Sequence, residues 1–161
     1  MFLSQALTRI KNIKSKLARV DLAITACATH YEDSNPEYNY AAECKTRSTL
    51  LDEVRELKTR VLLTNAQTNV VWQKDTMTLA QLILINADLR SEMAWVTKQL
   101  AVGLEDDSGW RSKTRSKDDI RKVYADGYNK NLLRVQLELL ETNKEQIDGL
   151  MASVNNSTTL V

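Results

Sequence analysis

Residues 63–96 read LTNAQTNVVWQKDTMTLAQLILINADLRSEMAWV and lie where two long helical patterns meet. Apolar residues recur at steps of three and four up to Val61, and the same spacing resumes at Leu79. This spacing is typical of amphipathic helices. The residues in between are mainly polar, so we predict two long helices joined by a short polar turn.

Thr78 and Gln81 mark the start of the second helix. In a capping box, a hydroxyl accepts a first-turn backbone N–H while the side chain three residues later reaches back to the cap. We therefore predict a helix from Thr78 to about Leu104. Its apolar stripe consists of Leu79, Leu82, Ile83, Leu89, Met93, Val96 and Leu100.

Asn86 falls on this apolar stripe, and we expect it to be buried. A buried amide without partners costs about 1–3 kcal/mol. Two interpretations remain open. Asn86 either sets the register of a helical bundle or contacts a ligand.

Five polar residues end a helix that we predict over residues 36–68. They are Arg60, Thr64, Asn65, Gln67 and Thr68. The start of this helix is indicated by Pro36, at the first helical position. Asn65 and Thr68 continue the apolar stripe of the helix, and polar groups on such a stripe need partners. They either hold the turn or line a pocket between helices, where ligand sites are commonly built.

The rest of the chain is helical in pattern as well. Four glycines and one proline among 161 residues predict short loops and long helices. We predict one helix over residues 3–29 and another that begins between Ser116 and Tyr128, with a break or late start at Gly127. The stripe of this last helix consists of Leu132, Val135, Leu139, Gln146 or Ile147, Leu150 and Val154.

These helices predict the fold class and the domain organisation. We expect a mainly all-α fold of long antiparallel helical hairpins that form a bundle or a coiled-coil oligomer. A single domain over residues 1–161 would hold two pseudo-repeated hairpins, at about 1–70 and 76–158. The pattern LSQAL at residues 3–7 matches LAQLI at residues 79–83, although chance could also produce this similarity.

The overall charge argues against several partners. The net charge is only +1, so the composition does not predict binding to duplex nucleic acid.

Charged residues interrupt every apolar run well short of the roughly 18 residues of a membrane span, and no signal peptide is recognisable. We expect a cytoplasmic protein, in the host cytoplasm if the source is viral. The basic face of the first helix is solvated, pairs with an acidic partner helix, or binds a membrane surface or a phosphate backbone. It carries Arg9, Lys11, Lys14, Lys16 and Arg19.

The residues suited to catalysis and metal binding form no recognisable motif. Cys27 and Cys44 fit helical stripes, which is typical of buried free thiols in a reducing compartment. With His30, the single histidine, they lack the spacing of a zinc site. We predict no catalytic residue, metal ligand or cofactor. An enzyme remains the weakest hypothesis, and its candidate carboxylates are Asp88, Asp106, Asp107, Asp118 and Asp119.

A basic segment, residues 110–117, is the most ligand-like feature of the sequence. Its cations alternate with Ser and Thr, so they would share one side of an extended chain. Such a segment would bind an anion, and Trp110 could stack on a base or ring. The alternative is an exposed solvated loop. The cations are Arg111, Lys113, Arg115 and Lys117.

Several stretches resemble one family of small helical-hairpin proteins. They are MFLSQAL at residues 1–7, LTNAQT at 63–68, and TLAQ at 78–81 followed by DLR at 88–90. In these stretches the chain is similar to the DIP1984 or septicolysin-like family, although it lacks a Trp after Asn155 and carries a longer acidic insert before Trp110. The resemblance implies an oligomer, and it adds site candidates: Asn65, Thr68, Arg90, Arg111 and Arg115.

Three functions stay open at this level. The first is a non-enzymatic oligomer that binds, and could sequester, a small anionic ligand such as a signalling nucleotide, for example in viral counter-defence. The second is a structural coiled-coil protein without a ligand, and the third is a membrane-active lysin, as the family name implies. For the first function, the predicted ligand-binding residues are Arg111, Lys113, Arg115, Trp110, Asn65, Thr68, Arg90, Arg60 and Asn86.

Overall fold

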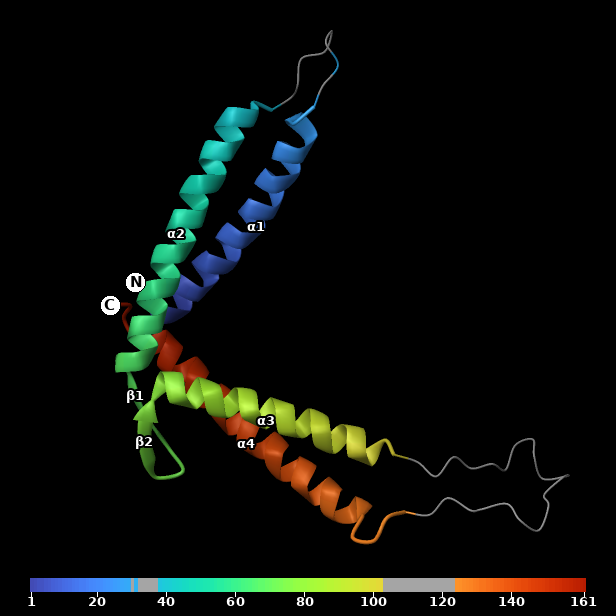
Figure 1. The fold of residues 1–161 in the computed structure, drawn as a ribbon. Helices are drawn as coiled ribbons and strands as arrows, with labels where there is room; N and C mark the ends of the chain where they lie inside the picture. The colour runs from blue at the N-terminus through green and yellow to red at the C-terminus, as the bar shows by residue number, and fades with distance from the viewer. Residues whose placement is uncertain (30, 32–37, 103–123) are drawn as a thin grey trace, which may run out of the picture. The chain divides into compact units, whose positions relative to one another are not determined.

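The computed structural model describes residues 1–29, 31, 38–102 and 124–161. In this part of the chain, long helices dominate and one short β-hairpin interrupts them (Figure 1). The predicted mainly all-α class is confirmed. The elements are α1 (Leu3–Cys27), α2 (Tyr40–Gln67), β1 (Asn69–Trp72), β2 (Asp75–Thr78), α3 (Leu79–Leu100) and α4 (Lys130–Ser157).

The chain divides into two compact units. Unit 1 comprises residues 1–83 and 149–161, and unit 2 comprises residues 84–148. Both divisions fall inside helices, because α3 and α4 each contribute residues to both units. The predicted hairpin boundaries differ from these divisions, and the proposed equivalence of the two hairpins stays a prediction.

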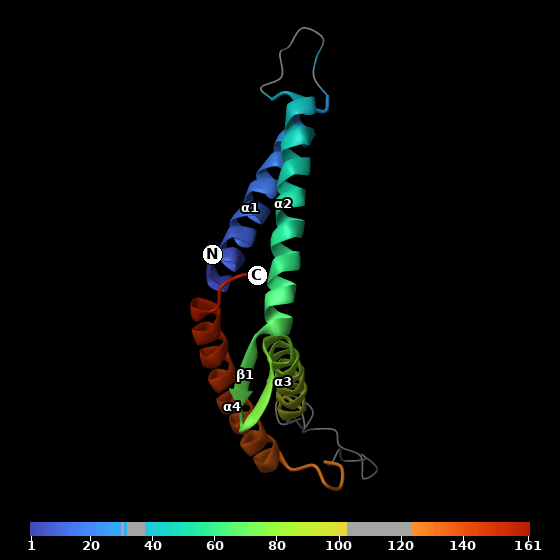
Figure 2. The same ribbon diagram turned by 90° about the vertical axis from the view of Figure 1, so that its left-hand side faces the viewer.

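Unit 1 is built on the antiparallel pair of α1 and α2, which lie side by side (Figures 1 and 2). The buried residues of α1 follow one another at steps of three and four, as expected for a face that packs on a second helix. Two ion pairs cross between the helices, from Arg9 to Glu53 and from Arg47 to Asp21. The buried residues of α1 are Leu3, Ala6, Ile10, Ile13 and Cys27, and those of α2 are Val54, Leu57 and Thr64.

The start of α2 corrects the prediction. The helix begins at Tyr40 instead of Pro36, and the Asn39 side chain caps it by accepting the Ala42 backbone N–H at 3.0 Å. Asn is among the best capping residues because its side-chain oxygen satisfies a free N–H of the first turn. Pro36 lies outside the described residues.

The β-hairpin between α2 and α3 was not predicted. β1 and β2 pair antiparallel, with Val70 opposite Met77, and a two-residue turn joins them. Gln73 and Lys74 in this turn have φ values of 49° and 75°. Such turns favour Asn-Gly, because left-handed backbone costs about 1–2 kcal/mol for other residues. Gln-Lys carries no turn signal, so the sequence pattern could not reveal the hairpin.

The C-terminal tail, residues 158–161, returns to the start of α1 within unit 1. Phe2 and Thr159 form an antiparallel bridge, the Leu3 N–H donates to the Thr158 carbonyl at 2.9 Å, and the Leu160 N–H donates to the Met1 carbonyl at 2.9 Å. Leu160 is buried. Backbone contacts therefore hold the two ends of the described chain together (Figure 2).

In unit 2, polar side chains connect α3 to α4. Gln136 donates to the Glu92 carboxylate at 2.9 Å, and the Tyr128 hydroxyl donates to the Gln99 carbonyl at 2.6 Å. Gly127 has a φ of 84°, and α4 starts just after it, with Asn129 as its cap. α4 therefore begins at Lys130, two residues beyond the predicted range of Ser116 to Tyr128 and on the late side that the glycine indicated.

The predicted stripe of α4 is wrong in its first half. The side chains of Leu132, Val135 and Leu139 are 66%, 63% and 61% exposed, whereas Leu140 and Ile147 are buried. This helix carries apolar residues on two neighbouring faces, and spacing alone cannot decide which of them packs inside the protein. The exposed residues Leu132, Val135 and Leu139 are called the α4 stripe below.

Candidate functional site

The candidate site lies in unit 1, where the end of α2, the β-hairpin and the C-terminal tail meet. We call residues 60–81 together with residues 158–161 the joint. It contains three of the predicted ligand-binding residues.

Thr64 is the centre of the joint, with only 1% of its surface exposed. Its hydroxyl donates to the Arg60 carbonyl at 2.8 Å and accepts the Val161 backbone N–H at 3.1 Å. The buried stripe of α2 therefore continues at Thr64, whereas Asn65, which we predicted to continue it, is only half-buried. Thr64 lies three residues after Val61, and a step of three fits a helical stripe as well as the step of four to Asn65.

Arg60 holds the tail from the other side. Its Nε donates to the Val161 carbonyl at 2.7 Å. Because the side chain is engaged with the backbone of the same chain, its contact in this structure is structural. The remaining guanidinium N–H groups can still donate to an anion, since Arg presents five donors.

Thr68 closes the end of α2. Its hydroxyl donates to the Thr64 carbonyl at 2.8 Å, and its own carbonyl accepts the Leu79 N–H at 2.7 Å. Thr68 thus adds a second bond to the Thr64 carbonyl, which also accepts the Thr68 backbone N–H at 2.9 Å, and ties the end of α2 to the start of α3. This geometry fits the interpretation in which Thr68 holds the turn.

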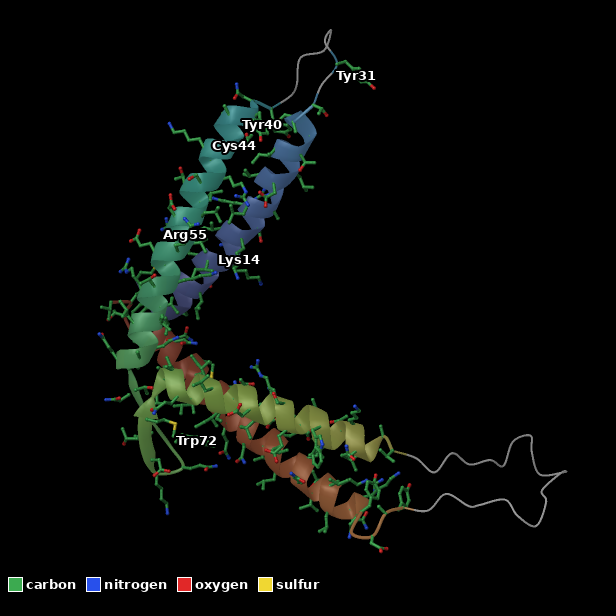
Figure 3. All side chains as sticks on the ribbon, viewed as in Figure 1. Lys14, Tyr31, Tyr40, Cys44, Arg55 and Trp72 are labelled. Atoms are coloured by element: carbon green, nitrogen blue, oxygen red, sulfur yellow. The ribbon has the colours of Figure 1, made fainter. Side chains whose placement is uncertain are left out.

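Two buried polar atoms in the joint make no hydrogen bond with any described residue. They are the Asn65 side-chain oxygen and the indole nitrogen of Trp72. The first is an acceptor and the second a donor, and each costs about 1–3 kcal/mol when it stays unsatisfied. Trp72 ends β1 beside the turn of the hairpin (Figure 3). Such atoms are rare in folded proteins and mark places where a further molecule can supply the partner.

The start of α3 completes the joint as predicted. The Thr78 backbone N–H donates to the Gln81 side chain at 2.8 Å, and the Gln81 N–H donates to the Thr78 hydroxyl at 3.2 Å. This is the reciprocal pair of bonds in a capping box. The Thr78 hydroxyl thereby satisfies a free N–H group in the first turn of α3.

In unit 2, Asn86 and Arg90 converge on one carboxylate. Asn86 is 2% exposed, and its amide donates to Asp148 at 2.9 Å. Lys144 pairs with the same carboxylate at 2.5 Å, and Arg90 lies 3.8 Å from it. The hydrogen bonds from Lys144 and then Asn86 lower the pKa of Asp148 below its ordinary value, and the positive charges of Lys144 and Arg90 add to this against the effect of burial.

The Asp148 cluster (Asp148 with Asn86, Arg90 and Lys144) is therefore a polar contact between α3 and α4. It fits the interpretation in which Asn86 sets the register of the helix pair, because the amide accepts only one alignment of its partner. Sequence reasoning missed Asp148 and Lys144, whose spacing of four on one helix was the available signal.

The predicted site residues thus fall into three groups. Arg60, Asn65 and Thr68 belong to unit 1, and Asn86 and Arg90 belong to unit 2. The remaining four, Trp110, Arg111, Lys113 and Arg115, lie outside the described residues.

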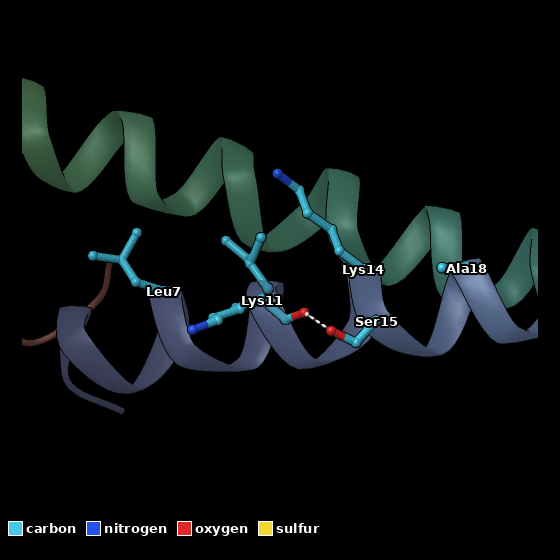
Figure 4. A pocket seen from close by; sticks show the side chains of 6 residues that line it. Leu7, Lys11, Lys14, Ser15 and Ala18 are labelled. Carbon is cyan, nitrogen blue, oxygen red and sulfur yellow. Dashed lines mark hydrogen bonds between the residues drawn. The ribbon is translucent and has the colours of Figure 1, made fainter.

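A groove of about 530 Å³ lies along α1 (Figure 4). Lys11 and Lys14 border it, and the Ser15 hydroxyl donates to the Lys11 carbonyl at 3.2 Å. The volume falls within the range of small-molecule sites, and the two ammonium groups would favour an anion. However, a single helix face lines the groove, so it could surround little of a ligand. Its lining residues are Leu7, Ile10, Lys11, Lys14, Ser15 and Ala18.

Other kinds of site find little support in the described part of the chain. It contains no group of three or more His, Cys, Asp or Glu side chains that could hold a metal ion. None of the described helices is both long and apolar enough to cross a membrane.

Comparisons with known proteins identify a similar fold but no function. No family model matches the chain, and no curated protein matches it. Among solved structures, the chain is similar to a functionally unknown conserved protein from Corynebacterium diphtheriae, with a TM-score of 0.82 and 19% sequence identity. The match covers 100% of this chain and 99% of that one, and at this identity it shows a shared fold alone.

Proposed function

We propose that this protein is a non-enzymatic helical oligomer that binds, and thereby sequesters, a small anionic ligand of the nucleotide class. The observation that carries the proposal is the pair of unsatisfied buried atoms in the joint, on Asn65 and Trp72. An amide acceptor and an indole donor are the groups that can hydrogen-bond the polar edges of a base. A bound ligand would remove the free-energy cost that both atoms carry in the described chain.

The anionic character of the ligand is inferred from the sequence. Arg111, Lys113 and Arg115 alternate with hydroxyl residues and offer charged donors for phosphate. Arg60 in the joint keeps further N–H groups beyond the one that holds Val161. A sequestering role needs only such stable contacts and no acid–base group.

Self-association is supported by the α4 stripe. Leu132, Val135 and Leu139 form an exposed apolar row, and rows of this kind mark interaction surfaces. Two cations, Lys130 and Arg134, lie at the start of this row, and three glutamates lie at its end or just beyond it. In an antiparallel pair of two α4 helices, the basic half of one copy would lie against the acidic half of the other. The three glutamates are Glu138, Glu141 and Glu145.

The ligand is tested by native mass spectrometry of the protein as purified from cells, followed by denaturing analysis of any released molecule. We expect a discrete adduct with the mass of a nucleotide. Asn65→Leu and Trp72→Phe should lose the adduct without loss of stability, because each removes an unsatisfied polar atom. Trp95→Phe, at an exposed indole on α3, is the matched control and should keep the adduct.

The anion contacts are tested by Arg111→Ala combined with Arg115→Ala. This double variant should lose the adduct while its helical circular dichroism and its oligomer size stay unchanged. A wild-type protein without an adduct, whose melting temperature also does not respond to linear or cyclic nucleotides, would contradict ligand binding. It would favour the second candidate, an assembly protein that uses the α4 stripe alone.

The oligomer is tested by sedimentation of charge variants of α4. Arg134→Glu should weaken self-association, and adding Glu141→Arg should restore it, because the pair of charges is exchanged. A wild-type protein that stays monomeric at high concentration would refute this part of the proposal.

A further inference from the structure

The two cysteines of the chain lie at the same end of the α1–α2 pair. Cys27 is the last residue of α1, and Cys44 lies in the second turn of α2. Both are free thiols; Cys27 is 6% exposed and Cys44 is half-buried. Cys27 also continues the buried face with which α1 packs on α2.

The ion pair nearest to Cys27 indicates that the first turns of α2 lie beside it. Asp21 of α1 pairs with Arg47 of α2. In an antiparallel pair, each step toward the end of α1 corresponds to a step toward the start of α2. Cys27 lies six residues beyond Asp21, and six residues before Arg47 is position 41, in the turn that holds Tyr40 and Cys44.

Tyr40 provides independent support for this proximity. A hydrogen bond with the Cys44 side chain raises the pKa of the Tyr40 hydroxyl, and the charge of Cys44, burial and the charge of Cys27 raise it further. Both cysteines therefore act on the pKa of the Tyr40 hydroxyl. Figure 3 places Tyr40 and Cys44 together at the start of α2.

We propose that Cys27 and Cys44 are an oxidisable thiol pair that closes to a disulfide within one chain and staples this end of the α1–α2 pair. The inference goes beyond the proposed function and does not depend on it. No described backbone contact locks this end, whereas tail contacts hold the opposite end of α1. The staple would supply the missing constraint.

The reaction proceeds by thiol–disulfide exchange with a small disulfide such as oxidised glutathione. Cys44, the more exposed thiol, loses its proton, and its thiolate attacks the reagent and releases one glutathione thiolate. The Cys27 thiolate then attacks the Cys44 sulfur of the mixed disulfide and releases the second glutathione thiolate. The two cysteines lose two electrons, which reduce the reagent disulfide, and their two protons end on the released thiols through water.

The test treats the full-length protein with oxidised glutathione, blocks remaining thiols by alkylation and maps the peptides by mass spectrometry. We expect a monomer-internal link between Cys27 and Cys44, no retained glutathione, and a melting temperature raised by roughly 5–15 °C. Reduction with dithiothreitol should reverse both effects.

Two conservative variants identify the order of attack and guard against a folding defect. Cys27→Ser should retain glutathione on Cys44, because the resolving thiol is gone. Cys44→Ser changes the more exposed position, should keep the wild-type circular dichroism, and should leave Cys27 unlinked. A wild-type protein that retains glutathione, forms only disulfides between chains, or does not react would overturn the proposal.

Discussion

Units 1 and 2 are both built from paired helices, but their charged contacts are arranged differently. In unit 1, apolar side chains pack between α1 and α2, two separate ion pairs cross between the helices, and backbone hydrogen bonds attach the tail to the start of α1. In unit 2, Val96, Leu140 and Ile147 are buried, and three polar side chains converge on the single carboxylate of Asp148. Charged contacts depend on pH and salt, whereas apolar packing depends on them much less. The comparison shows that the described part of unit 2 concentrates charged contacts on one titratable group, whereas unit 1 distributes them along the helix pair.

The largest loss of stability is expected when apolar packing is removed from unit 1. Leu3 is 1% exposed at the start of α1. Leu3→Ala should lower the free energy of unfolding by about 2–5 kcal/mol, because the buried methyl groups leave a cavity. Chemical denaturation measures this change. Leu7→Ala, one turn later at a 42% exposed position, is the control, and an equal loss there would show that α1 packing does not dominate.

A smaller effect is expected from the tail contact of unit 1. Thr64→Val removes the hydroxyl that accepts the Val161 N–H and leaves that group without its partner. We expect a loss of about 1–2 kcal/mol in denaturant unfolding. Thr59→Val is the matched control, because the Thr59 hydroxyl makes only the local bond to the Arg55 carbonyl. If both variants lose the same amount, the tail contact adds no stability.

Acid should distinguish unit 2 from unit 1. The pKa of Asp148 is lowered in the folded state, so its contribution to stability is present above the unfolded pKa of about 3.9 and is lost as pH falls through the folded pKa. The effect should be small, because the carboxylate is partly exposed. Stability measured against pH in wild type and in Asp148→Asn should converge at low pH.

Lys144→Met tests the cause of this pH dependence. It removes the contact that lowers the pKa of Asp148 most strongly, so the acid-dependent loss should be smaller and should be complete at a higher pH than in the wild type. An unchanged pH profile would show that the Asp148 cluster does not stabilise unit 2.

The smallest effect concerns the turn of the β-hairpin. Lys74→Gly should stabilise the protein by about 1 kcal/mol or less, because glycine adopts a φ of 75° without strain, although its greater freedom in the unfolded chain offsets part of the gain. Thermal unfolding measures the change. Lys58→Gly, in the middle of α2, is the control and should destabilise.

Local patterns predicted the helices well. The capping box at Thr78 and Gln81 and the late start after Gly127 depend on residues close together in the chain, and both are present. The four-residue strands of the β-hairpin carried too few residues for a recognisable alternation, and the Gln-Lys turn lacked a turn signal. Short elements without turn residues therefore escape sequence reasoning.

The candidate site was harder to predict because its contacts are distant in sequence. Asn86 was expected to be buried, and it is, but its partner Asp148 is 62 residues away. Arg60 reaches a backbone carbonyl 101 residues away. The burial of a residue can be predicted from a stripe of nearby apolar residues. The identity of its hydrogen-bond partner can be found only in the tertiary structure. The α4 stripe shows the same limit, because two apolar faces on one helix compete for the interior.

The tail contact has a consequence for how the chain folds during synthesis. Unit 1 needs residues 149–161, so its early helices cannot obtain their last partners until the ribosome has translated almost the entire described chain. Unit 2 is continuous in sequence, and all its residues are made before the tail. Contacts of high sequence separation slow folding because a long loop must close first. We therefore expect residues 1–83 to form helices early in synthesis and to complete their packing only after residues 149–161 have been translated.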